Sequence, residues 1–241
     1  MDCNFLLRFL ITLLFLPLLC SSCLGQDSDP IAKYREAATK RWDKSISQLE
    51  ELDKSERDPK NAILYIGSSS IRRWTTVAED MAPWPAIRRG YGGAKFSDLA
   101  VFVDRLVNPH QFDALVIFVG NDISGSEQDK TPEEVLRLFN YVVERVRVGH
   151  PKQPIFLIAI TPTSSRFHVW PQVQAMHKLV EEYVAKDDSL HFIATAKEFI
   201  GADGKPKDEL FVKDRLHLNE DGYDLWASII KKHLEKVLGQ P

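Results

Sequence analysis

Cysteine is nearly absent from this chain of 241 residues, and its three copies, Cys3, Cys20 and Cys23, all lie within the first 25 residues. The rest of the sequence therefore has no disulfide framework, no thiolate nucleophile and no cysteine metal site. Any chemistry performed there must use oxygen or nitrogen groups.

An excess of charge of one sign is also missing. The sequence contains 31 Lys and Arg and 34 Asp and Glu, its formal net charge is -3, and no long run of one sign occurs. A nucleic-acid-binding protein usually carries a basic stripe, so we expect no nucleic-acid partner. Internal repeats, low-complexity tracts and linkers are absent too, and the length suits one domain better than two.

One long apolar run is present near the start of the chain. Residues 9–20 are almost entirely apolar, and small residues follow them. A run of this length followed by small residues is typical of a secretory signal rather than of a transmembrane span. We expect residues 1–25 to be a signal peptide cleaved near Gly25, and the protein to be exported (secreted, periplasmic or envelope-attached). Acylation of Cys23, which would provide a lipid anchor, is an alternative.

Residues 26–58 are expected to form an N-terminal amphipathic helix. Asp29-Pro30 is a typical helix start, and apolar residues then recur at steps of three and four. This apolar stripe consists of Ile31, Tyr34, Ala38, Trp42, Ile46, Leu49 and Leu52. We expect the helix to pack on the outside of a domain formed by residues 59–241.

Short apolar runs alternate with helical patterns from residue 59 onward. The expected strands are residues 62–66, 86–88, 114–119, 155–160 and 190–193, and the expected helices are residues 96–106, 131–146, 169–185 and 220–238. This alternation predicts an α/β fold with a central parallel sheet of about five strands, buried on both faces. In such sheets the active site lies beyond the carboxyl ends of the strands.

Serines, glycines and an asparagine follow the first three strands. Gly67-Ser68-Ser69-Ser70 follows the first, and a serine at a strand-to-helix turn is exposed near the positive end of a helix. Gly90-Tyr91-Gly92-Gly93 follows the second, where glycines let backbone N–H groups turn toward a ligand. Asn121 follows the third and can donate to a developing oxyanion. Taken singly, each segment is also compatible with a capping turn, a phosphate-binding turn or a tight turn.

A histidine and a carboxylate stand just before the last helix, in Asp214-Arg215-Leu216-His217. Histidine is the usual general base near neutral pH, and a carboxylate three residues earlier can accept from its Nδ1–H. The Nε2 atom is then free to take a serine proton. Taken alone, the pair is equally compatible with an exposed ion pair. Together with the strand-end segments it completes the set of groups that acyl transfer requires.

The order of these segments resembles the SGNH (GDSL-like) hydrolases, from about residue 61 to the C-terminus. Gly67-Ser68-Ser69 stands where that family has Gly-Asp-Ser, and Gly93 matches the glycine of its second block. Asn121 matches the asparagine of the third block, and Asp214 and His217 match the Asp-x-x-His of the last.

The resemblance implies a fold, a set of roles and a reaction. The implied fold is a flavodoxin-like three-layer α/β/α sandwich, and no metal or cofactor is implied. Ser69 would be the nucleophile, with His217 as its base and Asp214 as the orienting acid. The oxyanion hole would consist of the backbone N–H groups of Ser69 and Gly93 and the side chain of Asn121.

The sequence departs from the family pattern at two positions. Ser68 replaces an aspartate that generally supports the turn, so we expect the turn to be held differently. Val119 stands where a glycine is frequent, and we expect it to narrow the site near Asn121. Ser70 is an alternative nucleophile, although the block alignment favours Ser69.

Three further residues are candidates for the pocket wall, whereas the remaining histidines and three tryptophans have ordinary structural explanations. We expect Tyr91, His168 and Trp170 to line the substrate pocket, and packing within a loop is the alternative for His168 and Trp170. The other histidines show no metal-ligand spacing, and we interpret them as surface or loop residues: His110, His150, His177, His191 and His233. Three tryptophans are interpreted as packing residues: Trp42, Trp74 and Trp226.

The expected function is hydrolysis of a small carboxylic ester through an acyl-enzyme on Ser69. Removal of acetyl groups from carbohydrates is the first substrate hypothesis, and hydrolysis of lysophospholipids or other acyl lipids is the alternative. A non-catalytic flavodoxin-like module that binds phosphate or flavin is a rival from another class, and so is a decayed enzyme that serves as an interaction module. The sequence does not indicate an oligomeric state.

Overall fold

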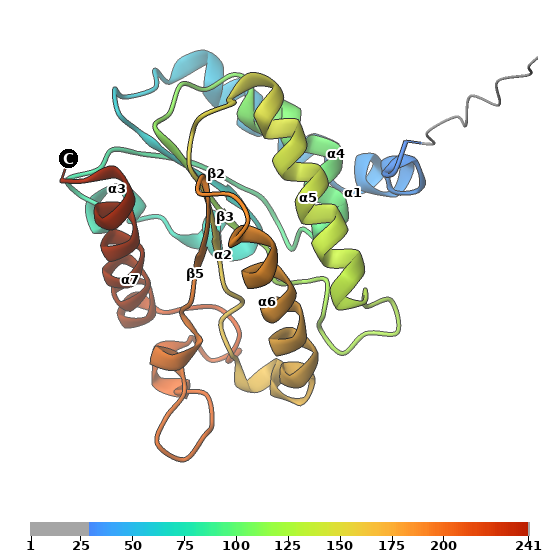
Figure 1. The fold of residues 1–241 in the computed structure, drawn as a ribbon, viewed down its shortest axis with the longest axis vertical. Coiled ribbons are helices and arrows are strands. Elements are labelled where there is room, and N and C mark those ends of the chain that lie inside the picture. The colour runs from blue at the N-terminus through green and yellow to red at the C-terminus, as the bar shows by residue number, and fades with distance from the viewer. Residues whose placement is uncertain (1–28, 241) are drawn as a thin grey trace, which may run out of the picture. The chain divides into compact units, whose positions relative to one another are not determined.

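A five-stranded parallel sheet lies at the centre of the computed structural model, which describes residues 29–240 (Figure 1). The predicted signal peptide, residues 1–25, and the possible lipid-anchor residue Cys23 lie outside the described residues and stay predictions. The strand order is β2-β1-β3-β4-β5, and every pairing is parallel. The strands are β1 (Ile63–Gly67), β2 (Ala86–Gly90), β3 (Ala114–Phe118), β4 (Ile155–Ile158) and β5 (Leu190–Ile193).

Helices cover both faces of this sheet, as Figure 1 shows. On one face lie α1 (Ala32–Ser55), α4 (Phe96–Val107), α5 (Pro132–Gly149) and α6 (Trp170–Val184). On the other lie α2 (Ser69–Arg73), α3 (Val77–Asp80) and α7 (Glu220–Leu238). Three short 3-10 helices complete the described elements: η1 (Ser164–Val169), η2 (Ala196–Phe199) and η3 (Asp208–Leu210). The predicted three-layer α/β/α fold is confirmed.

The apolar strands are buried on both faces because neighbouring residues point to opposite sides of the sheet. In β1, Leu64 and Ile66 belong to the core beneath α1, α4, α5 and α6, whereas Ile63 and Tyr65 belong to the core beneath α2, α3 and α7. All four are fully buried. Continuous apolar runs are therefore required here, which is why the sequence shows no hydrophobic alternation in this strand.

The long helix α1 packs along α4 and belongs to the same compact unit as the sheet. Ala38 and Ile46 of its predicted stripe are buried, and Trp42 packs against the same core. Arg105 of α4 binds α1 through Glu50 at 2.7 Å and Asp43 at 2.6 Å. No helix among residues 29–240 combines the length and the apolar character that a membrane span needs.

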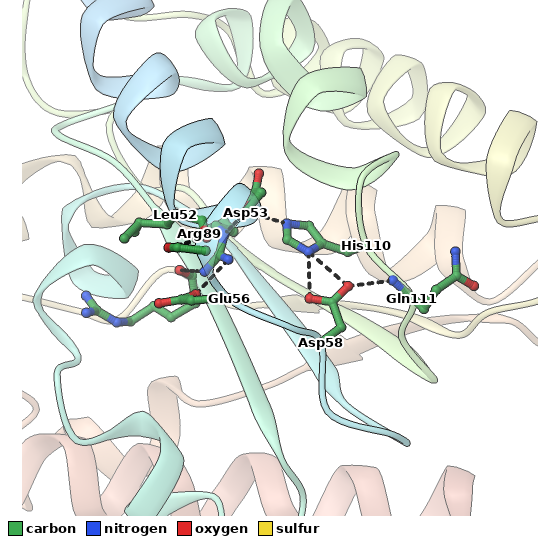
Figure 2. Close-up of polar contacts among 9 residues, drawn as sticks. Leu52, Asp53, Glu56, Asp58, Arg89, His110 and Gln111 are labelled. Atoms are coloured by element: carbon green, nitrogen blue, oxygen red, sulfur yellow. Dashed lines mark hydrogen bonds and ion pairs between the residues drawn. The ribbon is translucent and has the colours of Figure 1, made fainter.

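A second set of polar contacts fixes the end of α1 (Figure 2). Asp53 lies between Arg89, whose Nε donates to it at 2.6 Å, and His110, whose Nε2 is 3.3 Å away. Arg89 also binds Glu56 at 2.9 Å, and Nδ1 of His110 lies 3.0 Å from Asp58. These contacts connect the last turn of α1 to β2 and to the segment that precedes β3.

The expectation that the unassigned histidines are surface or loop residues is wrong for His177, which lies on α6, whereas His110 and His150 lie in loops as expected but are buried. His110 is buried between Asp53 and Asp58, as just described. His150 is buried with its ring stacked on Phe112, and His177 is buried on α6. Each has a polar or aromatic partner far away in the sequence, which the spacing of residues along the chain does not reveal.

Candidate active site

The turn after β1 places Ser69 at the start of α2. Gly67 has φ = +141°, a backbone conformation that side chains disfavour, and a Cβ atom there would lie 2.0 Å from the carbonyl oxygen of Phe118. The N–H of Ser68 donates to that same carbonyl at 2.9 Å. Glycine is therefore required where the chain leaves the sheet beside β3, and the next residues turn sharply into the helix.

His217 reaches Ser69 from the segment before α7. Its Nε2 lies 3.0 Å from the Oγ of Ser69, and its Nδ1 lies 2.7 Å from the Oδ2 of Asp214. His217 and Ser69 are 148 positions apart in the sequence, so only the fold brings them together. Ser70 is placed differently: its backbone carbonyl accepts from the hydroxyl of Tyr223, and the serine that the imidazole of His217 meets is Ser69.

Asp214 holds the histidine through three hydrogen bonds. Besides binding Nδ1, it accepts from the backbone N–H groups of Leu216 and His217, each at 2.9 Å. Partial burial acts to raise the pKa of this carboxyl, but the backbone and imidazole hydrogen bonds of His217 outweigh it and lower the pKa to about 2. The carboxylate is therefore ionised at neutral pH, and it fixes both the position and the tautomer of the imidazole.

The segments after β2 and β3 meet beside this pair. The Nδ2 atom of Asn121 donates to the carbonyl of Ala94 at 3.0 Å, and it lies 3.9 Å from where a Cβ on Gly93 would be. Asn121 lines the same pocket as Ser69 and His217. The predicted site residues Ser69, Gly93, Asn121, Asp214 and His217 thus gather at the carboxyl edge of the sheet.

Helix α1 supports the glycine segment after β2. Gly92 has φ = +32°, and a Cβ there would lie 2.0 Å from the ring of Trp42. That ring also packs edge-on against Tyr91, with ring centroids 5.6 Å apart. The interpretation of Trp42 as a packing residue agrees with these contacts, and the segment that carries Gly93 rests directly on it.

Of the three predicted pocket residues, Trp170 lines the pocket and the other two do not. Tyr91 is buried in the core between Trp42 and Phe102, on the side of the sheet covered by α1 and α4. His168 is exposed and covers Gly125. These two expectations are corrected, because the direction of a side chain after a strand or within a loop depends on the path of the backbone.

The two departures from the family pattern have simple structural consequences. Ser68 is buried at the turn, where its backbone N–H binds Phe118 as described above. Val119 packs in the core and is not among the pocket-lining residues, so the expected narrowing near Asn121 is not observed.

The pocket around Ser69 is small, with an apolar wall and a polar lining residue. It encloses about 600 Å³, including its open mouth. Ile123, Ile160 and Val173 give it an apolar wall, and the buried Trp226, predicted to be a packing residue, contributes to it as well. Arg166 is a polar lining residue that the sequence did not single out.

The arrangement contains the groups that acyl transfer needs. A serine hydroxyl lies within hydrogen-bond distance of an imidazole, which in turn binds a carboxylate, and amide donors lie nearby. Among residues 29–240, no group of three or more His, Cys, Asp or Glu side chains is placed to hold a metal ion.

Two sequence comparisons bear on the family of this chain. Residues 60–225 match the model of the GDSL-like lipase/acylhydrolase family. A search of the curated proteins found no match.

Several solved structures share the fold. A protein from Streptococcus pneumonia whose name refers to platelet activating factor has a TM-score of 0.72 at 20% identity, covering 83% of this chain and 95% of that one. A GDSL-like lipase from Bacteroides thetaiotaomicron has a TM-score of 0.66 at 17% identity, covering 79% and 97%. A family 3 carbohydrate esterase from Talaromyces cellulolyticus has a TM-score of 0.57 at 14% identity, covering 73% and 97%.

Proposed function

Because this chain belongs to the GDSL-like lipase/acylhydrolase family, we propose that it cleaves short-acyl carboxylic esters through an acyl-enzyme on Ser69. The observation that carries the proposal is the contact of 3.0 Å between the Ser69 hydroxyl and Nε2 of His217. The ionised Asp214 on the far side of the imidazole completes the arrangement.

The reaction would proceed in two halves. As the Oγ of Ser69 bonds to the ester carbonyl carbon, Nε2 of His217 takes the hydroxyl proton and then passes it to the departing alcohol oxygen. The carbon–oxygen bond to that alcohol breaks, and the acyl group stays on Ser69. In the second half, His217 takes a proton from water and the water oxygen bonds to the acyl carbon. The bond between the acyl carbon and Oγ of Ser69 then breaks, the proton returns to Oγ, and the carboxylic acid leaves. Asp214 stabilises the imidazolium in both halves.

The negative charge on the carbonyl oxygen would be held by three donors. These are the backbone N–H groups of Ser69 and Gly93 and the Nδ2 of Asn121. The adjacency of Gly93 and Asn121, with Nδ2 at 3.9 Å from the Cβ position of the glycine, supports this assignment. Such donors act most strongly in a site that is pre-arranged and partly dry.

Short acyl groups are favoured because buried side chains form part of the pocket wall. Val173 and Trp226 are both buried and both line the pocket. A long acyl chain would have to displace these core residues, whereas an acetyl group would not. An acetylated carbohydrate is our first choice of substrate, and the carbohydrate esterase from Talaromyces cellulolyticus with the same fold is in keeping with it. Lysophospholipids remain the competing substrates.

Kinetics with matched variants test this proposal. We would measure hydrolysis of p-nitrophenyl esters with acyl chains from two to twelve carbons, using the purified protein, Ser69→Ala and Ser70→Ala. The proposal predicts the highest kcat/KM with the shortest esters, loss of turnover in Ser69→Ala and retained turnover in Ser70→Ala. A preference for the longest chains would favour the lipid substrates.

The same samples distinguish the enzyme from its rivals. A fluorophosphonate probe should label the parent protein and Ser70→Ala, but not Ser69→Ala. An unlabelled and inactive parent protein would instead support a binding module or a decayed enzyme. Neither of these needs a histidine within hydrogen-bond distance of the Ser69 hydroxyl.

A further inference from the structure

Arg166 enters the active-site pocket from η1, the short helix between β4 and α6. Its side chain is partly buried, and its Nη1 donates to the carbonyl of Gly120 at 2.9 Å and to Oδ1 of Asn121 at 3.0 Å. It lines the pocket together with Ser69 and His217. Its partners are 45 and 46 residues away in the sequence.

The hydrogen bond from Arg166 determines which way the carboxamide of Asn121 faces. A carboxamide has one acceptor oxygen and two N–H donors, whereas a guanidinium can only donate. Turning the amide over would set its NH₂ group against the N–H of Arg166 and would also lose the bond from Nδ2 to Ala94. Arg166 and Ala94 therefore hold the amide from both ends, with Nδ2 on the side of Gly93.

The charge of Arg166 has no counterion in the part of the chain that the structure describes. No carboxylate there lies within ion-pair distance of its guanidinium, although Asp129 acts on it from farther away. Burial lowers the pKa of the guanidinium. Placing an uncompensated cation in a partly buried pocket is costly for folding. The cation is held instead by two neutral acceptors, the carbonyl of Gly120 and Oδ1 of Asn121.

We propose that Arg166 is a positioning residue for the oxyanion hole, which holds the Asn121 carboxamide with its Nδ2 toward the reacting carbonyl. This inference rests on the proposed esterase function. It assigns to Arg166 an effect on turnover that is transmitted through Asn121. Recognition of an anionic group on the substrate would be a different role, and it would weaken substrate binding when the arginine is removed.

A double-mutant cycle tests this assignment. We would measure kcat and KM with p-nitrophenyl acetate, a neutral ester, for the parent protein, Arg166→Met, Asn121→Ala and the double variant. The proposal predicts that Arg166→Met lowers kcat about 10- to 100-fold, because a misplaced oxyanion donor is costly, with little change in KM. In the Asn121→Ala background the same substitution should change kcat by no more than about twofold, since its effect acts through the missing amide.

Two controls make the result decisive. Arg145→Met removes an arginine of α5 that pairs with Asp104 at 2.6 Å, away from the pocket, and should leave kcat unchanged. Thermal unfolding of each variant detects a loss of folding. Equal losses of kcat in both backgrounds, or a rise in KM as the main effect, would overturn the proposal. An inactive parent protein would refute the proposed esterase function itself, so the two failures are distinguishable.

Discussion

His177 should make the stability of the protein depend on pH. It is buried on α6, and its Nε2 accepts the backbone N–H of Ile160, just beyond β4, at 2.9 Å. Burial lowers the pKa of this imidazole to about 4, whereas the pKa of a histidine in an unfolded chain is about 6.5. As the pH falls, the unfolded chain therefore takes up this proton first. The stabilisation by neutral His177 is fully present above about pH 6.5 and is lost as the pH falls toward 4.

The size of the effect follows from these two pKa values. Between pH 7 and pH 5 the unfolded histidine becomes almost fully protonated while the folded one stays neutral. Proton linkage then predicts a loss of about 2 kcal/mol from the free energy of unfolding. His177→Gln removes the titrating group, and its side-chain oxygen can still accept from Ile160. The variant should lose about 2 kcal/mol less stability than the parent over this pH interval.

Urea unfolding followed by circular dichroism at pH 5, 6 and 7 measures this difference. Other groups titrate in both proteins, so the comparison of the two pH profiles isolates His177. If parent and variant lost the same stability between pH 7 and pH 5, the imidazole would not be buried in its neutral form, and the reasoning from its environment would be refuted.

Two further substitutions test the architecture of the site. Asn121→Ala should lower kcat for p-nitrophenyl acetate about 10²–10³-fold with little change in KM, and an unchanged kcat would argue against its role as an oxyanion donor. Gly67→Ala should lower the free energy of unfolding by at least about 2 kcal/mol, because the new Cβ would meet the carbonyl of Phe118 at 2.0 Å and the φ angle of +141° disfavours a side chain. Chemical denaturation would detect this loss, and a fully stable variant would contradict the account of the turn.

The sequence predicted the elements that carry the site. Each expected strand is present with its ends moved by two residues at most, because a doubly buried strand needs an uninterrupted apolar run. The rule that parallel strands end at one edge then brought Ser69, Asn121 and the glycine segment together. Asp214 and His217 could be paired because their three-residue spacing is local.

What the sequence did not predict depends on contacts between distant segments. Arg166 meets Asn121 only because η1 folds back over the end of β3, and no local pattern marks it. Tyr91 turns toward Trp42 and the core, since Gly92 lets the chain bend against that ring. The short helices α2 and α3 contain five and four residues, too few for a periodic apolar pattern.

The identity of the nucleophile is the central claim, and mapping a covalent adduct tests it most directly. The parent protein would be treated with a fluorophosphonate, digested with trypsin and analysed by tandem mass spectrometry of the peptide spanning residues 61–72, which contains all three adjacent serines. The account predicts an adduct on Ser69, and none on this peptide in Ser69→Ala. An adduct on Ser70, or a labelled serine elsewhere in the chain, would contradict it.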